Sequence, residues 1–189
     1  MTYPTELKAV RMDSSNKSVF LDKLKELDKD SPNKNKDWWP WLLKNYNTQF
    51  SSWYLTFHKD ELISFSAVQL FGDKARLCSR LWNGIRKPGL ERGGILNEGS
   101  PAMLMIELQL QDYKGYNYFF SMELLNRRSH LEKFAEKLNI KLGRSFKLNE
   151  NMHQTCRDET FKCWQSTISE KPLDLPEMKL EEWRERFGR

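Results

Sequence analysis

SWYLTFHKDELISFSAVQLFGDKARLCSRLW, residues 52–82, contains three runs of strand-forming residues joined by two short polar turns. Aromatic and β-branched residues are frequent in the runs, which cover 53–57, 62–70 and 75–82. Runs at such short separation are typical of antiparallel neighbours, because a tight turn brings the chain back beside itself. We therefore predict an antiparallel meander of three strands.

One strand and two helices are expected before the meander. Leu7–Met12 alternates as a short strand, and apolar residues recur at helical spacing from Val19 to Leu27. A second short helix is expected over Asp37–Tyr46, where Pro40 is compatible with a first helical turn.

The second predicted helix carries three tryptophans, Trp38, Trp39 and Trp41. Indoles can stack on the bases of single-stranded nucleic acid. They can also pack as structural side chains in a groove beside a sheet. We prefer the packing interpretation, because no basic cluster accompanies the tryptophans.

After a loop over 83–99, the chain predicts a second series of elements. Ser100 and Pro101 have the character of a helix N-cap and first residue, so we expect a helix to Lys114. The elements expected beyond it are a strand over Tyr116–Met122, a helix from Ser129, strands over Lys141–Lys147 and Thr160–Ile168, and a helix over 180–187. A polar loop holding His153 and Cys156 is expected between the last two strands.

The length and composition predict a single domain. The chain has 189 residues, a net charge of +5 and interleaved acidic and basic residues. We assign residues 1–170 to the domain and 171–189 to a tail whose amphipathic helix offers an oligomer contact. No apolar run approaches the roughly 20 residues of a membrane span, and no secretion signal is visible. Three cysteines without a CxxC pair indicate reduced thiols, so we expect a cytoplasmic protein without a metal site.

The order of the predicted elements resembles that of the GCN5-related N-acetyltransferase (GNAT) superfamily over nearly all of residues 5–168. FAEKLNI, residues 134–140, is similar to the family's LYEKLGF segment, where the fourth helix meets the next strand. In this chain it comes after the strand predicted at Tyr118–Met122. The resemblance implies an α+β fold with a mixed central sheet of about six to seven strands and helices on both faces.

The resemblance also implies acetyl-CoA as the donor substrate, bound between two splayed parallel strands. Main-chain groups of the first strand, at Leu81, Trp82 and Asn83, would bind the pantetheine arm, and Ser121 lies on the second strand. The basic segment from Asn126 through Arg128 would lie near the 3'-phosphate, although an exposed cap is the alternative.

In the family, the pyrophosphate lies on a loop with the pattern R/Q-x-x-G-x-G/A, where glycine allows close approach. Residues 82–100 read WNGIRKPGLERGGILNEGS, so Gly89 stands three positions after Arg86, but Glu91 stands where the second glycine belongs. The candidate residues of a diverged phosphate site are Arg86, Arg92, Gly93 and Gly94. A long loop that binds no phosphate is the equal alternative.

Amide formation requires a base for the ammonium proton and an acid for the departing thiolate. The acid in many family members is a tyrosine in the LYEKLGF segment, where this chain has Ala135. Candidates for the catalytic residues are Tyr118, Ser121 and Glu123 of the fifth predicted strand.

Two functions therefore stay open. The first is acetyl transfer from acetyl-CoA to an amine of a small molecule or a protein. The second is a catalytically inactive GNAT-like module that binds protein or nucleic acid, of a kind that occurs in phage genomes. Acceptor specificity in such folds resides in the variable first helices and last strands.

Overall fold

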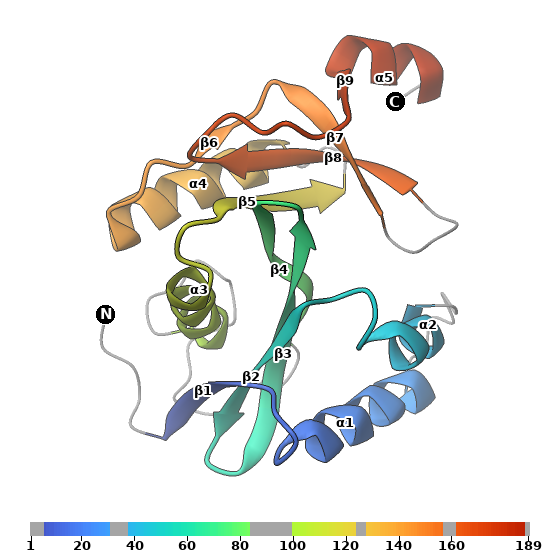
Figure 1. Ribbon diagram of the computed structural model, residues 1–189, viewed down its shortest axis with the longest axis vertical. Coiled ribbons are helices and arrows are strands. Elements are labelled where there is room, and N and C mark those ends of the chain that lie inside the picture. The colour runs from blue at the N-terminus through green and yellow to red at the C-terminus, as the bar shows by residue number, and fades with distance from the viewer. Residues whose placement is uncertain (1–5, 31–37, 84–99, 124–127, 157–161, 188–189) are drawn as a thin grey trace. The chain divides into compact units, whose positions relative to one another are not determined.

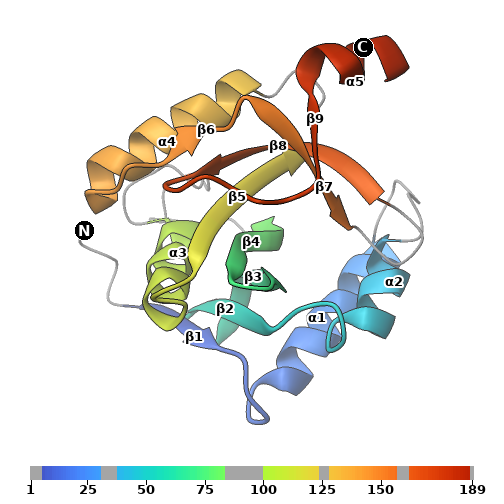
Figure 2. The same ribbon diagram turned by 45° about the horizontal axis from the view of Figure 1, so that its top comes forward.

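The computed structural model describes residues 6–30, 38–83, 100–123, 128–156 and 162–187 (Figures 1 and 2). Up to α4 the strands and helices follow the predicted order. They are β1 (Leu7–Arg11), α1 (Lys17–Asp30), α2 (Trp38–Asn45), β2 (Ser52–His58), β3 (Glu61–Phe71), β4 (Lys74–Asn83), α3 (Pro101–Asp112), β5 (Asn117–Glu123), α4 (Arg128–Leu142), β6 (Lys147–Leu148), β7 (Asn151–Cys156), β8 (Lys162–Ser169), β9 (Glu177–Lys179) and α5 (Leu180–Phe187).

The strands form a mixed sheet with the hydrogen-bonded order β1-β2-β3-β4-β5-β8-β7-β9, and β6 pairs with β8. Pairing is antiparallel except between β4 and β5, which run parallel. The predicted meander is confirmed as β2, β3 and β4. The described residues contain nine strands, slightly more than the six to seven expected.

The chain divides into two compact units that share β4. The N-terminal unit comprises Met1–Leu70 and Cys78–Lys114, and the C-terminal unit comprises Phe71–Leu77 and Gly115–Arg189. The predicted division into a domain of residues 1–170 and a tail stays a prediction. None of the described helices combines the length and hydropathy needed to cross a bilayer.

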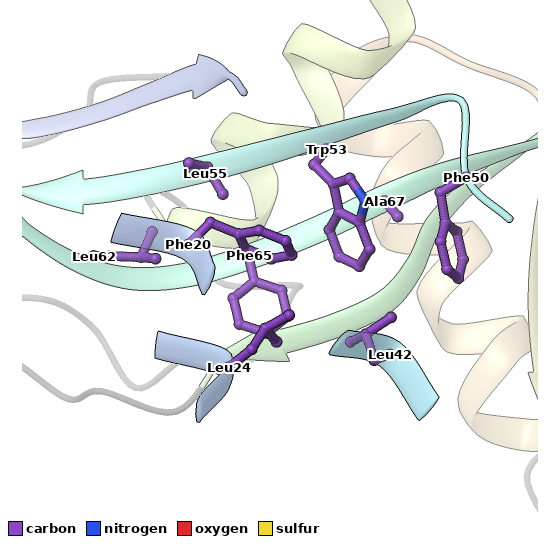
Figure 3. Close-up of a cluster of buried hydrophobic side chains, with 9 residues drawn as sticks. All are labelled: Phe20, Leu24, Leu42, Phe50, Trp53, Leu55, Leu62, Phe65 and Ala67. Carbon is purple, nitrogen blue, oxygen red and sulfur yellow. The ribbon is translucent and has the colours of Figure 1, made fainter. Parts of the chain in front are cut away.

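In the N-terminal unit, one face of β2 and β3 is packed with large apolar side chains. Figure 3 shows Phe65 of β3 and Trp53 of β2 meeting Phe20 of α1. The Phe20 ring lies 4.7 Å from the Trp53 ring and 5.2 Å from the Phe65 ring, measured between centroids. The Trp53 indole N–H donates to the Tyr46 carbonyl at 2.7 Å, so this buried polar group is satisfied. The cluster is the hydrophobic core of this unit.

Two of the tryptophans of α2 extend this core. Trp39 lies edge-on to Phe65 at 6.4 Å, and Trp41 lies edge-on to Phe50 at 6.2 Å between ring centroids. Both pack against the buried cluster. The packing interpretation is confirmed for Trp39 and Trp41; the side chain of Trp38 lies outside the described residues.

Helix α3 covers the opposite face of the same strands. The Tyr54 hydroxyl donates to the Asp112 carboxylate at 2.7 Å, and the Thr56 hydroxyl donates to the Pro101 carbonyl at 3.4 Å. The predicted N-cap is confirmed, because the Ser100 hydroxyl accepts from the Met103 N–H at 3.1 Å. The N-terminal unit therefore has helices on both faces of its strands.

In the C-terminal unit, α4 packs on β5 through aromatic side chains. Phe120 lies edge-on to Phe134 of α4 at 5.0 Å and to Phe146 at 5.4 Å. Trp183 of α5 packs on Met152 of β7 and Met178 of β9. The predicted helix at 180–187 is confirmed, and the three residues before it add a strand that the sequence did not predict.

The predicted strand over Lys141–Lys147 and the polar loop after it are wrong. Helix α4 continues to Leu142, and Gly143 then turns the chain with a φ of +61°. Residues Asn151–Cys156, expected as loop, form β7 between β8 and β9. Their polarity concealed the strand, because only Met152 of this segment enters the apolar cluster under α5.

The central position of Phe65 gives a first prediction. Its side chain is fully buried and contacts four aromatic rings. Phe65→Ala should lower the free energy of unfolding by about 3–5 kcal/mol, because the cavity cannot collapse among rigid rings. Chemical denaturation measures the loss. Ile140→Ala, at a side chain that is 76% exposed, is the control and should change it by less than about 0.5 kcal/mol; equal losses would contradict the assignment of this core.

Candidate functional site

Strand β4 changes its backbone conformation halfway along its length. Its parallel pairing with β5 joins Lys74–Arg76 to Asn117–Phe119. Further on, Cys78 has a φ of +50° and Arg80 a φ of +55°. A left-handed conformation costs a residue with a side chain about 1–2 kcal/mol, and such strain gathers at functional sites. The irregular part of β4 is the part that we expect to bind the donor.

The predicted donor-binding residues of β4 follow directly after this irregularity. Trp82 stacks on Phe65 with 5.1 Å between ring centroids, and the Lys23 ammonium lies 5.9 Å from the Trp82 ring. Leu81 is half-buried, and Asn83 ends the strand. The predicted phosphate-loop residues Arg86, Arg92, Gly93 and Gly94 lie outside the described residues.

The thiol of Cys78 is not activated. Burial raises its pKa to about 12, so the thiolate is scarce at neutral pH.

In the C-terminal unit, polar residues from four strands share one face of the sheet. Ser121 and Glu123 of β5 stand opposite Thr167 and Gln165 of β8. Gln165 in turn stands opposite His153 of β7. Residues paired in this way present their side chains on the same face. The face is therefore polar and carries two of the three predicted catalytic residues.

Arg76 of β4 contributes a positive charge to this polar face. Its guanidinium donates to the Gln165 side-chain oxygen at 2.9 Å. Burial lowers the pKa of Arg76 to about 10, an effect that Cys163 and Glu123 partly offset. The guanidinium therefore stays protonated at neutral pH, while its shielding from water strengthens its field.

His153 is buried on the same face and is neutral at pH 7. Burial lowers its pKa, and the Glu177 carboxylate and the Leu175 main chain partly offset this shift. Among the described residues, its ring nitrogens and the Ser121 hydroxyl find no hydrogen bond of good geometry. Buried polar atoms in this condition are rare in folded proteins.

The other predicted site residues of the C-terminal unit lie elsewhere. Tyr118 is on the opposite face of β5, where the Arg144 guanidinium lies 5.3 Å from its ring, and burial raises its pKa. Arg128 begins α4 and donates to the Glu150 carbonyl at 3.4 Å. Asn126 lies outside the described residues. Ala135, at the position of the family's tyrosine, is buried in α4 and supplies no hydroxyl.

Arg76, Gln165 and His153 were missed by the sequence analysis. Arg76 is far in the chain from the other two residues, and only the strand order places all three on one face. One signal was available: Cys163, Gln165, Thr167 and Ser169 are spaced two apart, which indicates a strand with a polar or small inner face.

No protein-family model matches the chain, and no curated protein sequence matches it. Solved structures do match it. A GNAT-family protein from Bacteroides thetaiotaomicron has a TM-score of 0.51 and 13% sequence identity, and the match covers 88% of each chain. The ribosomal L7/L12 α-N-protein acetyltransferase, solved with coenzyme A, has a TM-score of 0.50 and 12% identity, with 89% of this chain and 95% of the other covered.

A third structure, a GNAT-family protein from Desulfovibrio desulfuricans, has a TM-score of 0.50 and 9% identity over 87% of this chain and 99% of the other. The chain therefore has the GNAT fold in a divergent form.

Proposed function

We propose that this protein transfers an acetyl group from acetyl-CoA to an amine. The observation that carries the proposal is the left-handed backbone at Cys78 and Arg80. It interrupts the strand that GNAT acetyltransferases use to bind the pantetheine arm, and strain of this kind persists where function requires it. One of the matched structures contains coenzyme A, which supports the same donor class.

The donor would be held by groups of three kinds. Main-chain groups of Leu81, Trp82 and Asn83 would bind the pantetheine arm, as the fold implies. The loop residues Arg86, Arg92, Gly93 and Gly94 would contact the pyrophosphate, where glycine permits close approach and arginine supplies charge. Asn126 and Arg128 would contact the 3'-phosphate, and Ser121 would lie near the thioester.

The polar face of the C-terminal unit provides the groups for proton transfer. Glu123 is exposed and carries a carboxylate suited to accept the ammonium proton. The free amine then attacks the thioester carbonyl and the carbon–sulfur bond breaks. The proton that the new amide nitrogen loses reaches the departing thiolate, relayed by the Ser121 hydroxyl or by water. Tyr118 faces the other side of β5 and is the third candidate.

The acceptor stays open between a small-molecule amine and a protein amine. A peptide with a free α-amino group is the first acceptor to test, because one matched structure is a ribosomal-protein α-N-acetyltransferase. We place the protein in the cytoplasm because Cys78 and Cys163 are free thiols. An oligomer contact through α5 stays part of the proposal.

A catalytically inactive module that binds protein or nucleic acid is the second candidate. The observation in its favour is Ala135, which is only 4% exposed and packs in α4 where active relatives carry a tyrosine hydroxyl. Direct transfer within one ternary complex depends largely on positioning, so the missing hydroxyl does not prevent activity.

Donor binding is the first test. Calorimetric titration should show acetyl-CoA binding to the wild-type protein, and Arg92→Glu should weaken it about tenfold by losing a charge-assisted contact with phosphate. Arg186→Glu makes the same charge change on α5 and should leave the affinity unchanged. No binding by the wild type at millimolar acetyl-CoA would remove the acetyltransferase proposal; equal affinities would move the phosphate site away from Arg92.

Proton transfer is the second test. Glu123→Gln should lower kcat for acetylation of an α-amino peptide by about 100-fold or more while leaving acetyl-CoA affinity unchanged, because it removes a base and no donor contact. Tyr118→Phe tests the third candidate, on the opposite face of the same strand, and should retain activity. If Glu123→Gln is active and Tyr118→Phe is inactive, the proton-transfer role belongs to Tyr118 and not to Glu123.

A further inference from the structure

A side chain of α3 contacts the irregular part of β4. The main-chain N–H of Cys78 donates to the side-chain oxygen of Gln109 at 3.0 Å. In a regular strand this N–H would point toward a neighbouring strand. The left-handed conformation of Cys78 directs it instead to the helix that packs on the sheet. The hydrogen bond is therefore specific to the irregular backbone.

The orientation of the Gln109 amide is determined by its two partners. An N–H can bond only to an acceptor, so the oxygen must face Cys78. The amide nitrogen then faces β3, where it donates to the Ser66 hydroxyl at 2.6 Å. The Ser66 hydroxyl donates in turn to the Met105 sulfur at 3.6 Å. Every member of this buried chain has a partner, as a polar network in a core requires.

Gln109 is an unusual residue for its position. It is fully buried, and the other buried residues of α3 are apolar: Pro101, Ala102, Met103, Met105 and Ile106. Leucine or methionine would fill the same space without the cost of burying an amide. An apolar residue, however, cannot accept a hydrogen bond from a main-chain N–H that no longer pairs with a neighbouring strand.

We propose that Gln109 is a positioning residue for the donor: it keeps Cys78 left-handed and so directs the main chain of β4 that binds acetyl-CoA. This rests on the proposed acetyltransferase function. Gln109 itself does not touch the cofactor. It acts through β4, because a residue with a side chain adopts a positive φ only where its surroundings enforce it.

Replacement of Gln109 tests this role. Gln109→Met keeps the length of the side chain and removes both hydrogen bonds, so the titrated affinity for acetyl-CoA should fall at least tenfold. Met103→Ala is the matched control, because Met103 is also buried in α3. It should destabilise the protein while leaving the donor affinity of the folded protein unchanged.

A rescue separates positioning from packing. Glycine adopts a positive φ without strain, so Cys78→Gly combined with Gln109→Met should recover most of the lost affinity. The single variant Cys78→Gly should bind within about threefold of the wild type. If the double variant binds as weakly as Gln109→Met, Gln109 acts by packing and the proposal is overturned.

A second measurement uses the protein without ligand. Amide hydrogen exchange should show the Cys78 N–H protected in the wild type and exposed in Gln109→Met, with chemical shifts of Cys78 moving from left-handed toward extended values. Wild-type protein that binds no acetyl-CoA would overturn the proposed function and the cofactor role of Gln109 together. Wild-type binding with full affinity in Gln109→Met would overturn the role of Gln109 alone.

Discussion

Side-chain alternation along β2 and β3 is the constraint on which the N-terminal unit depends. Successive residues face opposite sides, so Trp53, Leu55, Phe65 and Ala67 form one surface and small or polar residues form the other. The aromatic surface must be covered, and α1 and α2 cover it. The other surface carries the hydroxyl groups of Tyr54, Thr56 and Ser66, and α3 approaches it with groups that pair with these hydroxyls.

This second surface explains how an amide came to lie in the core of α3. A helix on a face of leucines would have no use for a buried glutamine, but Ser66 offers the acceptor that Gln109 needs. The amide then has one free acceptor atom, and β4 supplies an N–H to it. The strained strand and the polar face of β3 are thus two ends of one hydrogen-bonded chain. Residues that never contact the donor can thus determine the backbone conformation of the strand that binds it.

The order of elements could be predicted because each long element carries its own periodicity; α4 and the three-strand meander are examples. The strand over Lys141–Lys147 failed because α4 continues to Leu142 and Gly143 then turns the chain. Strand β7 was missed because pairing with two neighbours, and not its own composition, makes it a strand. The left-handed conformation of Cys78 could not be predicted for a related reason. Cysteine has no preference for a positive φ, and the residue that enforces this conformation stands 31 positions later in the chain. Arg76, Gln165 and His153 came together only through the strand order.

The placement of the tryptophans has an optical consequence. Trp39, Trp41, Trp53 and Trp82 lie in or against the aromatic core of the N-terminal unit, while Trp164 and Trp183 pack around the methionines of β7 and β9. Each unit thus contains its own fluorophores in its own core. The emission of the whole protein follows both units at once, and a single curve recorded during denaturation is a weighted sum of two local transitions when the units unfold separately.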